Sequence, residues 1–157
     1  MAAPSPVETA TDLPLLGWRE WLALPALGIV AVRAKVDTGA RSSSLHVESQ
    51  ETFHRDGVEW VRFGLDTGRY QAPLAFAESP VLERREVTDS GGHRTERIFI
   101  QTRLCLAGRQ WEGEVNLAQR RNMLFPMLLG RTALAGRFLV DPAASFLQGE
   151  PPPEPTP

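Results

Sequence analysis

Residues 34–40 read Ala-Lys-Val-Asp-Thr-Gly-Ala, and this stretch decides how the rest of the chain is interpreted. Residues 29–36 alternate in polarity, with Arg33 and Lys35 opposite the apolar side chains, which is typical of a strand. The side chains that we expect on its apolar face are Val30, Val32, Ala34 and Val36. Asp37 follows at once, and Gly39 permits a close turn because it has no Cβ. The stretch therefore predicts a strand that delivers a carboxylate into a tight turn.

Short segments of alternating polarity, separated by turns that contain glycine or proline, fill most of the chain. The expected strands are 17–22, 29–36, 45–47, 58–65, 81–87, 98–106, 111–117 and 138–140, with an apolar run over 123–129. Turn signals at 25–28, 89–92 and 107–110 predict hairpins. Residues 131–136 suit one helical turn, and no long segment has helical periodicity. The pattern predicts an all-β barrel or sandwich with one short helix.

Length and composition predict one globular domain over residues 14–148. The polar, proline-bearing residues 1–13 and the proline-rich residues 149–157 are expected to form a disordered arm and a disordered tail. A formal net charge of −2 gives no electrostatic reason to expect nucleic acid as a partner. Because no leader sequence and no long apolar run is present, we expect a cytoplasmic protein that does not enter the membrane.

Two copies of Asp-Thr-Gly occur, one beginning at Asp37 and one at Asp66. An isolated aspartate is a weak base at neutral pH, whereas two aspartates held face to face share a proton and can activate a water molecule. The second copy is followed by Arg69, not by a small residue, and it stands where a hairpin needs a turn. We therefore interpret Asp37 as the catalytic candidate and Asp66 as a turn residue.

Two blocks of sequence carry a resemblance to a known family. The first is Lys-Val-Asp-Thr-Gly-Ala at 35–40 with Ser-Leu-His at 44–46, and the second is Phe-Pro-Met-Leu-Leu-Gly-Arg at 125–131 with Phe-Leu-Val-Asp at 138–141. Their order, with a glycine-rich hairpin between them, resembles that of retroviral-type aspartic proteases. Over residues 17–147 the chain more closely resembles the bacterial family named ATP-dependent zinc proteases, which are retropepsin-like proteins associated with RimK-type glutamate ligases.

The resemblance implies a closed, retropepsin-like (acid protease) β-barrel in which Asp37 is the catalytic carboxylate. One such aspartate per chain has a structural consequence, because a dyad needs two carboxylates. We therefore expect a homodimer in which the Asp37 residues of two chains meet beside a twofold axis.

Further residues have expected roles at this site. Those expected to fix the turn, line the cleft or form a flap are Thr38, Gly39, Ala40, Arg41, Gly91 and Gly92, and those expected to be structural are Gly130 and Arg131. An inert surface hairpin explains the pair at 91–92 equally well. Retroviral enzymes place an acid directly after Asp-Thr-Gly-Ala, where it pairs with the later arginine. Because Arg41 stands there in this chain, Arg131 needs another partner, and Asp141 or a backbone carbonyl are the candidates.

No metal or nucleotide motif is recognisable in the sequence, so we expect no cofactor. His46, His54 and His93 are not spaced as a ligand pair, and a phosphate-binding loop of the Gly-rich Lys-Ser/Thr type is absent. Cys105 is the single cysteine, which excludes an internal disulfide and fits a reducing compartment. A site formed in space by Asp37, His46 and Cys105 would make the protein a metal-dependent peptidase, which we keep as a third hypothesis.

Arginine side chains flank the expected hairpin. They are Arg84, Arg85, Arg94 and Arg97. If the hairpin is a flap, they favour an acidic substrate, and the family's association with glutamate ligases suggests a glutamate-rich tail. The interleaved glutamates explain the same arginines as a solvated, mixed-charge strand pair. We thus expect an aspartic peptidase acting on a peptide or protein, and the alternative is a non-catalytic β-barrel that binds a peptide or a partner enzyme.

Overall fold

The computed structural model describes residues 12–89, 91–119 and 124–150. Most of the arm and tail for which we expected disorder, residues 1–11 and 151–157, lies outside the described residues. Within those ranges the chain forms β-strands, a 3-10 turn at Pro25–Leu27 and a single four-residue helix, α1 (Arg131–Leu134). The prediction of an all-β fold with one short helix is confirmed.

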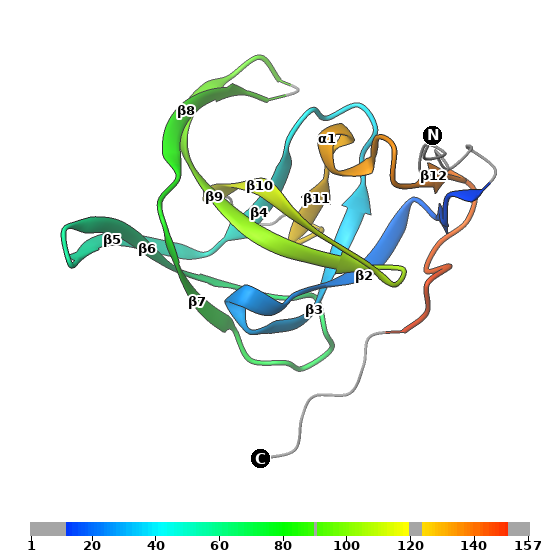
Figure 1. Cartoon of the computed structure of the whole chain (residues 1–157), viewed down its shortest axis with the longest axis horizontal. Coiled ribbons are helices and arrows are strands. Elements are labelled where there is room, and N and C mark those ends of the chain that lie inside the picture. The colour runs from blue at the N-terminus through cyan, green and yellow to red at the C-terminus, as the bar shows by residue number, and fades with distance from the viewer. Residues whose placement is uncertain (1–11, 90, 120–123, 151–157) are drawn as a thin grey trace, which may run out of the picture.

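Six strands close into a barrel in the order β10-β4-β11-β3-β2-β9, and β9 returns to pair with β10 (Figure 1). Their bounds are β2 (Arg19–Leu24), β3 (Ile29–Val36), β4 (Ser43–Val47), β9 (Arg94–Leu106), β10 (Arg109–Gln119) and β11 (Met127–Leu129). Strand β8 (Glu83–Thr88) pairs with β9 and forms a hairpin with it. Because the pairing of β9 with β10 closes the sheet, the fold is a barrel and not a sandwich.

The interior of the barrel is filled by the apolar faces of these strands. Leu45, Met127 and Leu129 are fully buried, and each such side chain contributes about 1.5–3 kcal/mol on removal from water. Because β11 has only three residues, this burial, together with pairing on both of its sides, holds it between β3 and β4. The core therefore fixes the strands that surround Asp37.

One side chain of β3 departs from the predicted alternation. Val30 was expected to point inward, but it is half-buried, while its neighbour Ala31 is buried. The pairing of β2 with β3 shifts register between Leu22 and Leu24, which indicates a β-bulge. An extra residue in one strand moves the following side chains to the opposite face. Beyond this point Val32, Ala34 and Val36 are buried as predicted.

A second sheet contains three strands in the order β5-β6-β7. Strand β6 (Val58–Leu65) was predicted, whereas β5 (Ser49–Arg55) and β7 (Ala75–Pro80) were not. Most side chains of β5 are exposed, so its sequence lacks the apolar alternation that would identify a strand. Strand β7 includes Pro80, which is tolerated because β7 is an edge strand.

A short pair formed by the first and last described strands lies beside the barrel. Strand β1 (Leu15–Leu16) pairs in parallel with β12 (Leu139–Val140), and the two lie near α1 in Figure 1. In the portion that the structure describes, there is no helix of the length and hydropathy required to cross a membrane.

Candidate active site

Asp37 lies at the end of β3, beside the end of β11. Strand β11 runs parallel to β3 on one side and antiparallel to β4 on the other. The N–H of Asp37 donates to the carbonyl oxygen of Leu129 at 2.9 Å, which continues the β3–β11 ladder to the aspartate. The two blocks that are separated in sequence therefore meet at this residue.

The side chain of Asp37 organises its own loop. Its Oδ1 accepts hydrogen bonds from the N–H groups of Gly39 at 3.0 Å and Ala40 at 3.2 Å. Within the described ranges its Oδ2 has no hydrogen-bond or ion-pair partner. Asp37 is half-buried, whereas Thr38 and Gly39 are exposed. The loop thus fixes the orientation of the carboxylate and leaves one oxygen available.

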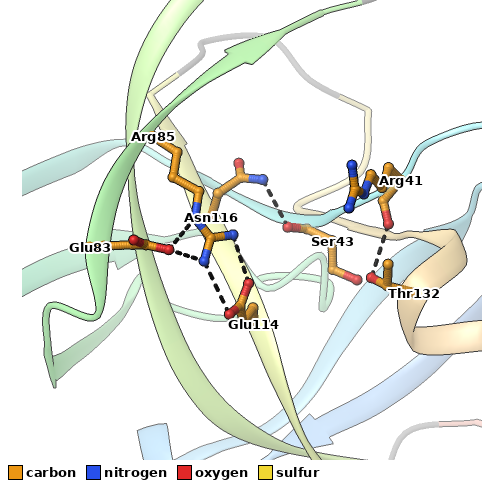
Figure 2. A network of polar contacts seen from close by, with 7 residues as sticks. All are labelled: Arg41, Ser43, Glu83, Arg85, Glu114, Asn116 and Thr132. Carbon is orange, nitrogen blue, oxygen red and sulfur yellow. Dashed lines mark hydrogen bonds and ion pairs between the residues drawn. The ribbon is translucent and has the colours of Figure 1, made fainter.

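The start of α1 braces this loop from behind. The N–H of Arg131 donates to the carbonyl oxygen of Ala40 at 2.7 Å. The carbonyl oxygen of Arg41 accepts from both the N–H of Thr132 at 3.1 Å and its Oγ1 at 2.9 Å, and Figure 2 shows the latter contact. The predicted Gly-Arg turn and the predicted Asp-Thr-Gly loop are therefore in direct contact.

Gly130 is required here by space and not by its backbone angles. Its φ of −90° is accessible to any residue. A Cβ at this position would, however, lie 2.6 Å from the carbonyl carbon and oxygen of Ser42, which is closer than such atoms can approach. This close contact supports the structural role that we expected for Gly130.

The guanidinium of Arg131 donates from Nη1 to the carbonyl oxygen of Thr38 at 3.3 Å. Of the two candidate partners, the backbone carbonyl is therefore the one observed. The Oδ1 of Asp141 instead accepts from the N–H of Ala143 at 2.9 Å. Arg131 thus connects α1 to the middle of the Asp-Thr-Gly loop.

The second Asp-Thr-Gly copy has a different setting. Asp66 is exposed and opens the connection between β6 and β7, where its Oδ1 accepts from the N–H of Gly68 at 2.8 Å. The carbonyl oxygen of the buried Thr67 accepts from the N–H of Arg33 at 2.9 Å. The tripeptide therefore forms a similar local turn in both places, but only Asp37 lies beside β11.

The β8–β9 hairpin rises from the barrel at the end where α1 and the β3–β4 connection lie (Figure 1). Its turn is held by Asp89, whose Oδ1 accepts from the N–H groups of Gly91 and His93, each at 2.9 Å. Gly92 has a φ of +83°, a conformation that favours glycine. The predicted hairpin is confirmed, and its glycines are exposed at the tip.

Arg85 ties this hairpin to the barrel wall. Its guanidinium donates to both carboxylate oxygens of Glu114 on β10, at 2.8 and 3.2 Å, and also contacts Glu83 (Figure 2). These carboxylates raise the pKa of Arg85 further above its usual range. The hydrogen bond from Arg85 lowers the pKa of Glu114, although burial acts in the opposite direction.

Two further hairpin arginines also have partners in the chain. Arg84 pairs with Glu59 at 2.9 Å and lies 3.9 Å from Glu96. Arg97 donates to Oδ1 of Asn116 at 3.0 Å. For Arg84 and Arg85 the structure therefore favours the mixed-charge interpretation over arginines held in reserve for a substrate.

A buried polar connection that the sequence did not reveal joins the hairpin to the Asp37 region. Asn116, which is 1% exposed, donates from Nδ2 to the carbonyl oxygen of Ser43 at 3.0 Å (Figure 2). Ser43 is itself buried, and its Oγ accepts from the N–H of Gly130 at 3.0 Å. The available signal was an asparagine between Val115 and Leu117 in an apolar stretch, since buried amides need partners.

The residues proposed for a metal do not form a site. The described residues contain no group of three or more His, Cys, Asp or Glu side chains placed to hold a metal ion. The Nδ1 of His46 lies 2.6 Å from the carbonyl oxygen of Phe125, so this ring nitrogen is engaged by the backbone. Cys105 is half-buried on β9, far along the strand from the hairpin tip. The arrangement does not fit a zinc centre at Asp37.

A closed six-stranded barrel with one Asp-Thr-Gly loop braced by a Gly-Arg turn defines a retropepsin-like protein. The chain belongs to the RimB-like family, described as retropepsin-like aspartic endopeptidase RimB, whose model matches residues 15–151. This finding supports the retropepsin-like part of the expected resemblance.

Curated relatives and a solved structure show the same similarity. Two proteins named "Probable alpha-L-glutamate ligase", from Shewanella pealeana and Shewanella halifaxensis, are 41% and 40% identical over 137 residues, which is 87% of this chain. The chain spans only 30% of the length of these relatives. A crystal structure of a Legionella pneumophila protein of unknown function matches with a TM-score of 0.71 and 27% identity, covering 85% of this chain and 97% of that one.

Proposed function

We propose that the chain is an aspartic peptidase that acts as a homodimer, with one Asp37 from each subunit. The observation that carries this proposal is the Asp37 loop, in which Oδ1 is held by two N–H groups while Oδ2 has no partner in the described part of the chain. A carboxylate with a fixed orientation and an available oxygen can accept a proton from water. Membership of the RimB-like family supports the same class of reaction.

In the proposed mechanism the two Asp37 carboxyl groups share one proton. The ionised carboxylate removes a proton from a water molecule, whose oxygen attacks the peptide carbonyl carbon. The protonated carboxyl donates its proton to the carbonyl oxygen, and collapse of the tetrahedral intermediate breaks the C–N bond as the leaving nitrogen is protonated. Twofold symmetry would present the same carboxylate from both subunits.

The residues around Asp37 have proposed roles in this site. Thr38 and Gly39 hold the turn, and Ala40 and Arg41 line the cleft. The hairpin at 91–92 would close over an extended peptide, exclude water and offer backbone hydrogen bonds. Its attachment through Arg85 and Glu114 restrains the base of the hairpin, so closure would move the part beyond Arg85.

A glutamate-rich tail is the substrate that we propose. The support is that relatives of this chain are named as glutamate ligases, since a ligase that adds glutamate creates a product that a peptidase could shorten. A functional link to a RimK-type glutamate ligase is part of the same proposal.

The coverage of the relatives favours a second candidate function. Since the matched region is 30% of proteins named as ligases, this barrel could serve as a non-catalytic module that binds a peptide or partner enzyme. The two candidates differ in whether Asp37 is needed for turnover.

The two Asp-Thr-Gly copies provide a matched experiment. Asp37→Asn should reduce hydrolysis of a glutamate-rich peptide by about 1000-fold or more, because amides cannot act as the base. Asp66→Asn should leave the rate unchanged, since Asp66 is exposed and outside the site. Equal rates for wild type and Asp37→Asn, or full activity from a species that sediments as a monomer, would reject the dimeric peptidase. Peptide binding without hydrolysis at any pH would select the binding module.

A further inference from the structure

Arg41 is an exposed cation four residues after Asp37. Its carbonyl oxygen is fixed by two hydrogen bonds from Thr132, so the position of its main chain is defined. The residue is exposed, and in the described part of the chain its side chain makes no hydrogen bond, ion pair or ring contact. In Figure 2 the contact with Thr132 is made by the carbonyl oxygen of Arg41 and not by its guanidinium. The side chain is therefore held near Asp37 at its base and is available at its tip.

Four arginines near the proposed cleft are engaged. Arg84, Arg85, Arg97 and Arg131 each have a partner within the chain. Binding a substrate carboxylate with one of these would require loss of an existing contact. Arg94 is also exposed and without such a contact among the described residues, but it begins β9 beside the hairpin turn and not beside Asp37. Arg41 is thus the available cation that follows the aspartate loop directly.

Arg41 changes the net charge of the proposed site. Two Asp37 carboxyl groups that share one proton carry one negative charge, which repels an acidic peptide. Two Arg41 side chains, each four residues after Asp37, reverse the sign of that local charge. An arginine stays protonated across the physiological range, and its planar group can donate two parallel hydrogen bonds to one carboxylate.

We propose that Arg41 is a specificity-determining residue that binds a glutamate side chain of the substrate close to the scissile bond. This inference rests on the proposed function and deepens it, because it assigns recognition of acidic peptides to one residue. It also gives a role to the arginine that follows Asp-Thr-Gly-Ala. Arg131 donates to the carbonyl oxygen of Thr38 and so does not need an acid at position 41.

Binding can be tested separately from hydrolysis. In an Asp37→Asn background, fluorescence anisotropy would measure the affinity for fluorescein-labelled hexaglutamate and for a matched hexaglutamine peptide. Arg41→Gln should weaken hexaglutamate binding by roughly 10- to 100-fold, the range for a charge-assisted pair, and should leave hexaglutamine binding unchanged. Arg41→Lys should restore part of the loss, because an ammonium group keeps the charge without the planar geometry.

Arg103→Gln is the control for a general loss of positive charge. Arg103 pairs with Glu112 near the β9–β10 turn, away from the hairpin tip. Equal losses for Arg103→Gln and Arg41→Gln, no loss for Arg41→Gln, or failure of hexaglutamate to bind would overturn the assignment. Binding that depends on Arg41 in a protein that hydrolyses no peptide would retain this inference and reject the peptidase. Hydrolysis without a preference for glutamate would retain the peptidase and reject the role of Arg41.

Discussion

The backbone N–H of Gly130 donates to Ser43 Oγ at 3.0 Å, and both residues are buried. This hydrogen bond joins positions 87 residues apart in the chain. Ser43 begins β4 immediately after the Asp37 loop, and Gly130 follows β11. The contact therefore joins the two segments that position Asp37. The atoms around Gly130 leave no room for a side chain at that position.

Gly130→Ala should destabilise the fold by about 3 kcal/mol, because the added Cβ meets the main chain of Ser42 at 2.6 Å and the backbone must move. Urea unfolding measures this loss. Gly28→Ala is the matched control, since Gly28 has a φ of +70° but open space around the position of a Cβ. The control should lose about 1–2 kcal/mol from backbone strain alone. No loss for Gly130→Ala would show that crowding at Gly130 is relieved without cost.

Asn116→Ala should destabilise the protein by about 2 kcal/mol, since it leaves the buried carbonyl oxygen of Ser43 without its donor. Asn116→Asp should also lose stability at neutral pH, because it keeps the acceptor for Arg97 but places a carboxylate oxygen against the carbonyl oxygen of Ser43. Thermal unfolding of both variants beside Gln110→Ala, an exposed change on the same strand, measures the difference. A loss for Asn116→Ala no larger than that for Gln110→Ala would contradict the bridging role.

The sequence predicts most of the barrel because its strands are half-buried and alternate in polarity. Ile29–Val36 and Val58–Leu65 have the same bounds in the structure as in the prediction. Strand β5 escaped prediction because both its faces are largely polar and exposed. The bulge that turns Val30 outward depends on pairing with β2, which is a property of two segments and not of one.

Some residues of the candidate site could be predicted from local sequence, and others depend on contacts between distant segments. Asp37 and Gly130 belong to contiguous motifs that can be recognised locally. The partner of Arg131 and the link between Asn116 and Ser43 depend on which strands become neighbours, so local patterns leave them open. The role of the hairpin arginines also needed the structure, because it places Glu59 and Glu114 beside them.

Glu20→Gln should release the C-terminal segment from the barrel. The buried carboxylate of Glu20 accepts from the N–H groups of Gly17 at 2.7 Å, Leu147 at 3.0 Å and Gln148 at 3.1 Å. An amide supplies one acceptor oxygen instead of two, so at least one of these donors loses its partner, at a cost of about 1–3 kcal/mol.

Hydrogen exchange should detect this release locally. The amides of Leu147 and Gln148 should exchange faster in Glu20→Gln, while those of the β9–β10 pair keep their protection. Glu48→Gln, an exposed change, serves as the control. Unchanged exchange at both amides would show that Glu20 does not hold this segment.

Glu114→Gln should lower thermal stability at pH 7 by about 1–3 °C, because it removes the charged partner of Arg85 at an exposed pair. The pKa of Glu114 lies below its ordinary value of 4.5 in the folded chain, so its contribution is complete above that value. The contribution disappears as pH falls through the lower folded pKa, because the carboxylate is then protonated in both states. Melting curves of wild type and Glu114→Gln should therefore differ at pH 7 and converge in acid. Glu51→Gln, an exposed change on β5, is the control and should show no such pH-dependent difference. If the melting temperatures of wild type and Glu114→Gln differed by the same amount at every pH, the ion pair would not be the cause.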